Sequence, residues 1–314
     1  MDSSHEPFLD IMEDTNDLMI HPHDIWFVAW DSWNIEHQTI DQAPKYIGED
    51  SLDAYVQIIR GWLQQWVSSN SCPIIHQQLY RMQMPRCMQN AFMACAVYFS
   101  RTSSNKSTVF HIINDQAGDL IQQHTTQTLG VATLTLAEHL ARVQTLLIFQ
   151  IIRLFDGDIR MRARAEMDNP VLTSWNTEMW QLASRILPAA DWSAVIPGST
   201  DSSSTLWKAW CLSESIRRTW LTTSILQSVY TTIRDGISAC PGGVFCTFGN
   251  ELWDATSDFE WGMRTTSGKN LYFLQSMGIG QLLVDAAATE VDDFGHAFML
   301  ISQGLEKKQR WTMK

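Results

Sequence analysis

Basic residues are scarce in this 314-residue sequence. Lysine and arginine together number 22, against 34 aspartates and glutamates, so the formal net charge is −12. Binding to a nucleic-acid backbone depends on clustered lysine and arginine side chains that neutralise phosphates. The composition therefore argues against this chain holding DNA on its own.

Paired cysteines and long apolar runs are also missing. The six cysteines include no C-x-x-C pair, and the opening MDSSHEPFLD shows no signal pattern. The longest apolar stretch, VQTLLIFQIIRLF, is interrupted by Gln150 and Arg153 and is too short to span a bilayer. We expect a soluble protein of a reducing compartment, with no disulfide framework and no membrane partner.

Sequence motifs of catalysis and cofactor binding are absent as well. The sequence contains no G-x-S-x-G, no P-loop and no H-E-x-x-H. Gly278-Ile279-Gly280 lacks the third glycine of a dinucleotide loop, and the pair His21 and His23 lacks a third ligand at a usable spacing. We therefore predict no catalytic residue, no metal site and no cofactor.

Helical periodicity dominates what is present. Apolar residues make up 45% of the chain, including 14 tryptophans, and recur at steps of three and four residues. Ser51 and Thr135 are the expected N-caps of two helices, the second running from Leu136 to about Phe155 with Glu138 completing a capping box. With strand signals nearly absent, the sequence predicts an all-α fold with further helices near residues 84–97, 109–121, 206–230 and 271–305.

Composition also divides the chain. Residues 1–24 are acidic and sparsely apolar, which fits either a flexible tail or an activation-type peptide. Residues 25–311 are expected to form a single irregular helical domain. Residues 188–205 hold two prolines, a glycine and five serines, and are the best candidate for a flexible linker. Proline and glycine cluster again in 240–261, which predicts a compact packed loop.

The stretch RLFDGDIRMRARAE, residues 153–166, carries two acids around a glycine. On a helix Asp156 and Asp158 point about 200° apart and do not converge on a metal ion. The residues that follow also do not supply the oxygens of a calcium loop. We expect a structural role instead, through i,i+4 ion pairs that link Asp156 to Arg160, Asp158 to Arg162, and Arg162 to Glu166.

A second charged cluster lies in SESIRRTW, residues 213–220. Glu214 and Arg218 are i,i+4 partners on a helix otherwise lined with tryptophan, and Arg217 lies one step round. A bound anion or a docking acid from another helix fits this arrangement, as does an internal salt bridge joining two helices. Of these alternatives, we expect the internal salt bridge.

Several stretches stand in order along the chain: GWLQQWVSSNSCPIIHQQLY, MPRCMQNAF, VQTLLIFQIIRLFDGDIRMRARAE, LWKAWCLSESIRRTWLTTSILQSVY, CTFGNELWDATSDFEW and VDDFGHAFMLISQGLEKKQRW. Taken together, they resemble the fungal-specific transcription factor domain. This is the helical regulatory region that follows a six-cysteine zinc cluster in fungal regulators. The resemblance implies an all-α domain with no catalytic residues, located in the nucleus or in both cytoplasm and nucleus. It also implies control of a metabolic or secondary-metabolite gene cluster through other transcription factors or coregulators, with a small-molecule effector.

By this resemblance the matched positions are architectural. They comprise Asp156, Asp158, Glu214, Arg217, Arg218, Trp253 and Trp261. The sequence departs from the family in one respect, because its first ninety residues contain only Cys72 and Cys87 and cannot assemble a zinc cluster. The chain is then either a truncated regulator or a stand-alone relative without direct DNA binding.

A competing hypothesis keeps the fold and changes the function. An aromatic core without a DNA-reading module is free to become a small-molecule binder or a biosynthetic enzyme. That alternative requires a deep cavity into which polar groups such as Glu214 and Arg217 point. The tryptophans expected to line it are Trp207, Trp210, Trp220, Trp253 and Trp261.

Overall fold

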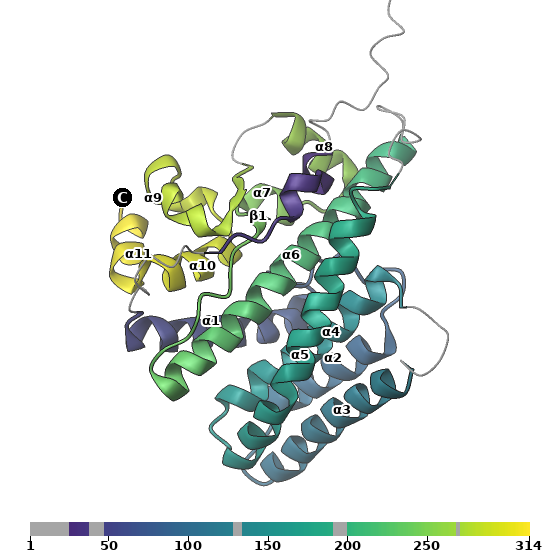
Figure 1. The fold of residues 1–314 in the computed structure, drawn as a ribbon, viewed down its shortest axis with the longest axis vertical. Helices are drawn as coiled ribbons and strands as arrows, with labels where there is room; N and C mark the ends of the chain where they lie inside the picture. The colour runs from purple at the N-terminus through teal and green to yellow at the C-terminus, as the bar shows by residue number, and fades with distance from the viewer. Residues whose placement is uncertain (1–24, 38–46, 128–133, 191–199, 268–270) are drawn as a thin grey trace, which may run out of the picture.

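The computed structural model describes residues 25–37, 47–127, 134–190, 200–267 and 271–314. Helices account for most of this length, so the all-α prediction is confirmed (Figure 1). The acidic segment 1–24, with His21 and His23, lies outside the described residues, as does 191–199 within the predicted linker. The α-helices are α1 (Glu49–Ser69), α2 (Arg86–Phe99), α3 (Lys106–Gln127), α4 (Leu136–Phe155), α5 (Ile159–Ile186), α6 (Thr200–Asp235), α7 (Asn250–Trp253), α8 (Asp258–Ser267), α9 (Leu282–Asp285), α10 (Asp293–Gln303) and α11 (Leu305–Thr312).

Helix α4 forms the centre of the fold. Every residue from Leu140 to Leu154 is buried, which requires neighbours on all sides. Helices α1, α2, α3, α5 and α6 supply them. The predicted start is confirmed, because Thr135 and Glu138 form a complete capping box.

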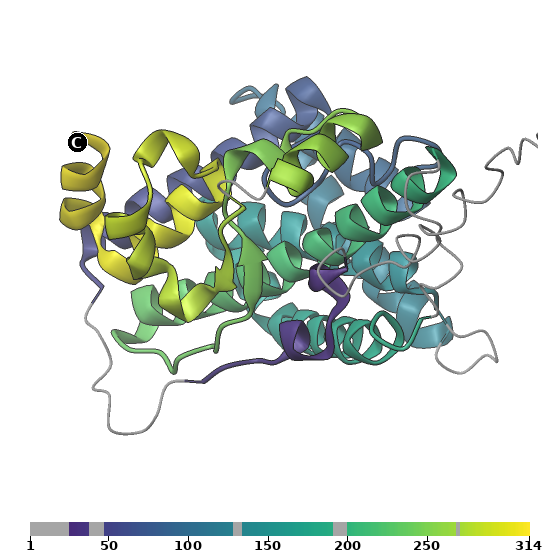
Figure 2. The same ribbon diagram turned by 90° about the horizontal axis from the view of Figure 1, so that it is seen from above.

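Helix α6 is the longest element and crosses the molecule beside α4 and α5 (Figures 1 and 2). Its first residues, 200–205, belong to the stretch that we expected to be linker. The smaller C-terminal elements gather along α6 and α1, with α8 and β1 against α6 and α10 against α1. Helix α6 therefore connects the large helical layer to the C-terminal part of the chain.

The region after α6 departs from the sequence prediction. Residues 271–305 do not form one helical run, because strand β2 (Phe273–Gln275), a 3-10 turn (Ser276–Gln281) and α9 precede α10. Gly278 and Gly280 weaken helix propensity there. Strand β2 pairs antiparallel with β1 (Phe245–Thr247), which lies inside the segment expected to be only a packed loop.

Ser51 also differs from its predicted role. Helix α1 begins three residues earlier than predicted, with Gly48 at the N-cap position, and its first turn is acidic, which suits the positive end of the helix dipole. Ser51 is buried and its Oγ accepts the backbone N–H of Leu305 at 3.0 Å. The other end of α1 is at Asn70, which adopts a left-handed conformation (φ 58°) three residues before Pro73.

Candidate functional site

Three charged side chains in the middle of α6 are completely buried. Glu214, Arg217 and Arg218 each have 0% exposure. The cost of burying an ion is large unless it is paired and hydrogen-bonded. The contacts of these three residues are therefore the first place to look for a site.

Arg218 ties four segments of the chain together. Its Nε donates to Glu214 Oε1 at 3.0 Å, which is the i,i+4 contact within α6 that the spacing indicated. Its Nη2 donates to Asp292 Oδ2 at 2.5 Å and to the Thr247 carbonyl at 2.8 Å, and its Nη1 donates to the Pro73 carbonyl at 3.2 Å. The guanidinium thus links α6 to β1, to the N-cap of α10 and to the turn after α1.

Glu214 and Trp253 complete this cluster. Glu214 accepts the backbone N–H of Thr247 at 2.9 Å and lies within 3.3 Å of its hydroxyl. The Trp253 ring covers the Arg218 guanidinium at 3.9 Å, and its indole N–H donates to the Cys72 carbonyl at 3.2 Å. The charged groups of this cluster therefore find their hydrogen-bond partners within the described part of the protein.

Asp292 is the acid that the sequence analysis did not single out. It caps α10 by accepting the backbone N–H of Gly295 at 2.8 Å, while it also accepts from Arg218. Burial raises the pKa of Asp292 to about 6, against the opposing effect of Arg218. The Asp292-Asp293-Phe294-Gly295 pattern is an N-cap signal, and that pattern was the sequence clue to its position.

Arg217 differs from its neighbour because no carboxylate pairs with it among the described residues. Its Nη2 donates to the Phe27 carbonyl at 2.5 Å and to the Ser32 hydroxyl at 2.8 Å, and its guanidinium lies 4.1 Å from the Trp33 ring. Burial lowers the pKa of Arg217 to about 10. Arg217 therefore fastens the segment before α1 to the middle of α6.

The acid–Gly–acid triplet forms the corner between α4 and α5. Gly157 has φ 97°, so the two helices are separate and Asp156 and Asp158 do not share one helix. Asp158 caps α5 by accepting the backbone N–H of Met161 at 2.9 Å. Asp156 accepts from Tyr98 at 2.6 Å and from Arg101 at 2.8 Å, which anchors the corner to α2.

The three predicted i,i+4 pairs are wrong. Among the described residues, Arg160 and Arg162 make no ion pair, and Glu166 instead accepts from Tyr230 and lies 3.8 Å from Arg234 on α6. The break at Gly157 explains why the first pair does not form, since Asp156 ends one helix and Arg160 lies on the next. The contacts that Asp158 and Asp156 do make are a helix cap and a tertiary salt bridge to Arg101.

The tryptophans near α6 pack against one another. Trp210 lies 6.3 Å from Trp253 and 6.0 Å from Trp261 between ring centroids, and Trp220 lies 5.2 Å from Trp180. Glu214 and Arg217 line none of the cavities that we describe. These tryptophans therefore form part of the buried core, and Trp253 also lines the polar cavity beside Arg218.

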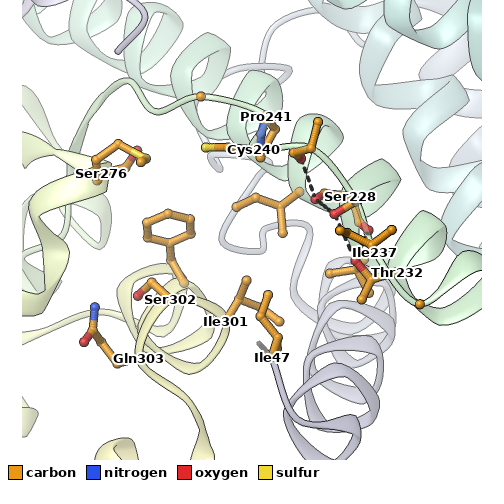
Figure 3. Close-up of a pocket in the computed structure, with 18 residues that line it drawn as sticks. Ile47, Ser228, Thr232, Ile237, Cys240, Pro241, Ser276, Ile301, Ser302 and Gln303 are labelled. Carbon is orange, nitrogen blue, oxygen red and sulfur yellow. Dashed lines mark hydrogen bonds between the residues drawn. The ribbon is translucent and has the colours of Figure 1, made fainter. Parts of the chain in front are cut away.

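An apolar pocket lies instead at the far end of α6 (Figure 3). It has a volume of about 290 Å³ between the last turns of α6, the loop that follows, the 3-10 turn after β2 and the end of α10. Figure 3 shows Ser228 and Thr232 along one side, with Cys240 and Ser276, and Ile301 and Ser302, around the rest. No sequence signal indicated this pocket, because its walls come together only in the folded chain.

A second, polar cavity of about 480 Å³ borders the Arg218 cluster. Arg218, Trp253 and Asp292 contribute to its wall, together with Asn250 and Asp254.

Within the described ranges no helix combines the length and apolar character that a bilayer span requires. No three His, Cys, Asp or Glu side chains in those ranges are grouped to hold a metal ion.

Sequence comparison relates this chain to a protein described as a transcription factor. The chain is 31% identical over 239 residues to "Transcription factor gsfR2" of Penicillium aethiopicum, across 76% of this chain and 56% of that protein. The chain thus spans little more than half the length of that relative. No family model matches the sequence, and no solved structure matches the chain. The similarity relates this helical protein to a fungal transcription factor.

Proposed function

We propose that the chain is a regulator of transcription in a fungus, and not an enzyme. The observation that carries this proposal is the 31% identity to a fungal transcription factor over 76% of the chain. The buried polar clusters support it, because Glu214, Arg217 and Arg218 hold elements together and offer no reacting group to a substrate. The named relative and the ordered family segments favour the regulatory region of such factors.

The chain acts on genes through other proteins in this proposal. Its 314 residues carry a net charge of −12 and no cysteine spacing that builds a zinc cluster, so nothing in them replaces a DNA-reading module. It pairs with other transcription factors or coregulators in the nucleus, and activates them or holds them inactive. The genes concerned belong to a metabolic or secondary-metabolite cluster, and a small-molecule effector adjusts the activity.

A repurposed biosynthetic enzyme is the second candidate. The polar cavity beside Arg218 and Asp292 is the observation that favours it, because charged groups meet there. Against it, Arg218 and Asp292 are already engaged with each other and with backbone groups. Catalysis needs groups free to exchange protons or bond to substrate.

The regulatory proposal is tested by tethering. The full chain is fused to a heterologous zinc-cluster DNA-binding module and expressed with a reporter gene that carries the cognate site. We expect reporter output to rise or fall several-fold relative to the module alone. Unchanged output, with the fusion present at normal levels in the nucleus, would contradict a role in transcription.

The absence of direct DNA binding is tested separately by electrophoretic mobility shift at physiological salt. The isolated chain is compared with a zinc-cluster factor on the same promoter fragments. We expect a shift only with the zinc-cluster factor, or a supershift when both are present. Tight and sequence-selective binding by the isolated chain would overturn this part of the proposal.

A further inference from the structure

We propose that the apolar pocket between α6 and α10 binds an uncharged, compact and largely apolar small molecule that carries a carbonyl or hydroxyl oxygen. The inference rests on the proposed function only in naming this ligand as the effector. The binding itself is measured on the purified chain. A failure of binding is therefore distinguishable from a failure of the transcription proposal.

Much of the pocket wall is hydrocarbon. Ile225 and Val229 of α6 are 5% and 1% exposed and face Phe298 and Ile301 of α10, and Ile47 approaches from the segment before α1. A ligand that fills this space removes its apolar surface, and that of the walls, from water. The volume of about 290 Å³ is at the lower end of small-molecule sites, so the ligand is compact.

Charge is absent from the pocket. None of the 18 residues that line it is an Asp, Glu, Lys, Arg or His, although charged residues make up 18% of the chain. An ionised ligand group placed there loses part of its hydration and finds no counter-ion, which is unfavourable. The pocket therefore selects uncharged molecules and disfavours phosphates, carboxylates and amines.

Three hydroxyl groups provide the polar side. Ser228 and Ser238 have their hydroxyl oxygens 2.6 Å apart, and the Thr232 hydroxyl lies 2.9 Å from that of Ser238. The three hydroxyls carry three protons, and the two contacts between them use two, so one proton remains to donate to a carbonyl oxygen while free acceptor positions serve a ligand hydroxyl. A carbonyl or hydroxyl oxygen on the ligand has a partner here, and the same groups orient it.

The pocket is positioned to influence the rest of the fold. Its two main walls are α6 and α10. Away from the pocket, the ion pair between Arg218 of α6 and Asp292, the N-cap of α10, already joins these two helices. A ligand that bridges Val229 and Phe298 adds a second connection between them. Ligand that binds only the folded state also stabilises that state by mass action.

Prodan, an uncharged naphthalene ketone whose emission reports polarity, is a suitable probe. We expect saturable binding to the purified chain, with emission shifted to shorter wavelength and an increase in melting temperature. Exposed Cys240 reports the location, because it lines the pocket and iodoacetamide reaches it directly. At a free probe concentration ten times its Kd, about a tenth of the protein molecules have an empty pocket. Alkylation of Cys240 is therefore expected to slow about tenfold.

Matched variants separate the pocket from the surface. Ser302→Phe fills the pocket and is expected to weaken prodan binding at least about tenfold. Ile233→Phe places the same ring on the exposed side of α6, outside the pocket, and is expected to bind prodan as the unmodified chain does. Thr232→Val keeps the volume but removes a hydroxyl, and weakens binding several-fold.

Three results overturn the proposal. They are no saturable emission shift, no protection of Cys240 at saturating probe, and equal prodan affinity in a folded Ser302→Phe variant. If Ser302→Phe does not fold by circular dichroism, Cys240 protection in the unmodified chain still decides. Loss of binding with an intact reporter response would remove the ligand site and leave the transcription proposal standing.

Discussion

At the scale of single residues, Asp158 shows how a conspicuous acid serves the backbone. Its carboxylate accepts the N–H of Met161 and satisfies one of the free donors at the start of α5. The sequence indicated a structural role, but it predicted the wrong partner. The difference follows from Gly157, whose left-handed backbone ends α4 before a continuous helix forms.

Replacing Asp158 with alanine tests this role. We expect Asp158→Ala to lower the free energy of unfolding by about 1 kcal/mol, because the cap is lost. Denaturant titration measures the change, and Asp158→Asn, which keeps a side-chain oxygen, is the control. A folded Asp158→Ala chain that lost a measurable turnover would show that the residue is catalytic.

His76 makes the stability depend on pH. It is 1% exposed and packs edge-on against Trp253 at 4.8 Å, and burial together with Arg218 lowers the pKa of His76 to about 3. The unfolded chain, with an ordinary histidine pKa, takes up a proton that the folded chain does not. Stability therefore falls as the pH drops below about 6.5, by about 2 kcal/mol at pH 5.

Urea melts at several pH values measure this loss. His76→Asn retains an acceptor for the Gln78 N–H, which His76 Nδ1 accepts at 3.1 Å, but has no titrating group. The variant is expected to lose less stability than the unmodified chain between pH 7 and pH 5. Equal losses in the two chains would show that other groups, such as His139, cause the pH dependence.

At the scale of elements, α6 holds the small C-terminal elements to the main helical layer. Arg218 provides the connection, through Glu214 on its own helix, Thr247 on β1 and Asp292 at the start of α10. The i,i+4 spacing predicted the first contact. The other two join residues 29 and 74 positions away, which no local pattern reports.

Breaking this connection should be severe. Arg218→Met leaves Glu214 and Asp292 as buried carboxylates without their cation, so we expect a loss of about 3–5 kcal/mol in the free energy of unfolding. Calorimetry or denaturant melts measure it. Arg310→Met, which removes an exposed i,i+4 pair with Glu306, is the matched control and should change stability by less than about 0.5 kcal/mol.

At the scale of the whole molecule, the reactivity of the cysteines reports which parts of the fold exclude solvent. Cys72, Cys95, Cys211 and Cys246 are buried, Cys87 is partly buried and Cys240 is exposed. Burial raises the pKa of the Cys87 thiol and of the four buried thiols, so they react slowly as well as being covered. One fast-reacting thiol is the expected signature of the native protein.

A thiol-reagent titration measures this signature. In native buffer we expect Cys240 to react first, with Cys87 slower and the other four unreactive on the same timescale. In denaturant all six are expected to react together. Fast reaction of Cys72 or Cys246 in native buffer would show that the region around Arg218 opens independently.

The sequence alone determined the helical class, the span of α4, its Thr135–Glu138 capping box and the Glu214–Arg218 pair. These depend on periodicity and on contacts within a few residues, so the local order of the chain decides them. The corner at Gly157, the Arg217 contacts with Phe27 and Ser32, the β1–β2 pair and the pocket lined by Cys240 were decided only by tertiary structure. Each of these except the corner brings together residues far apart in the chain, and the burial that stabilises them exists only after the helices have packed.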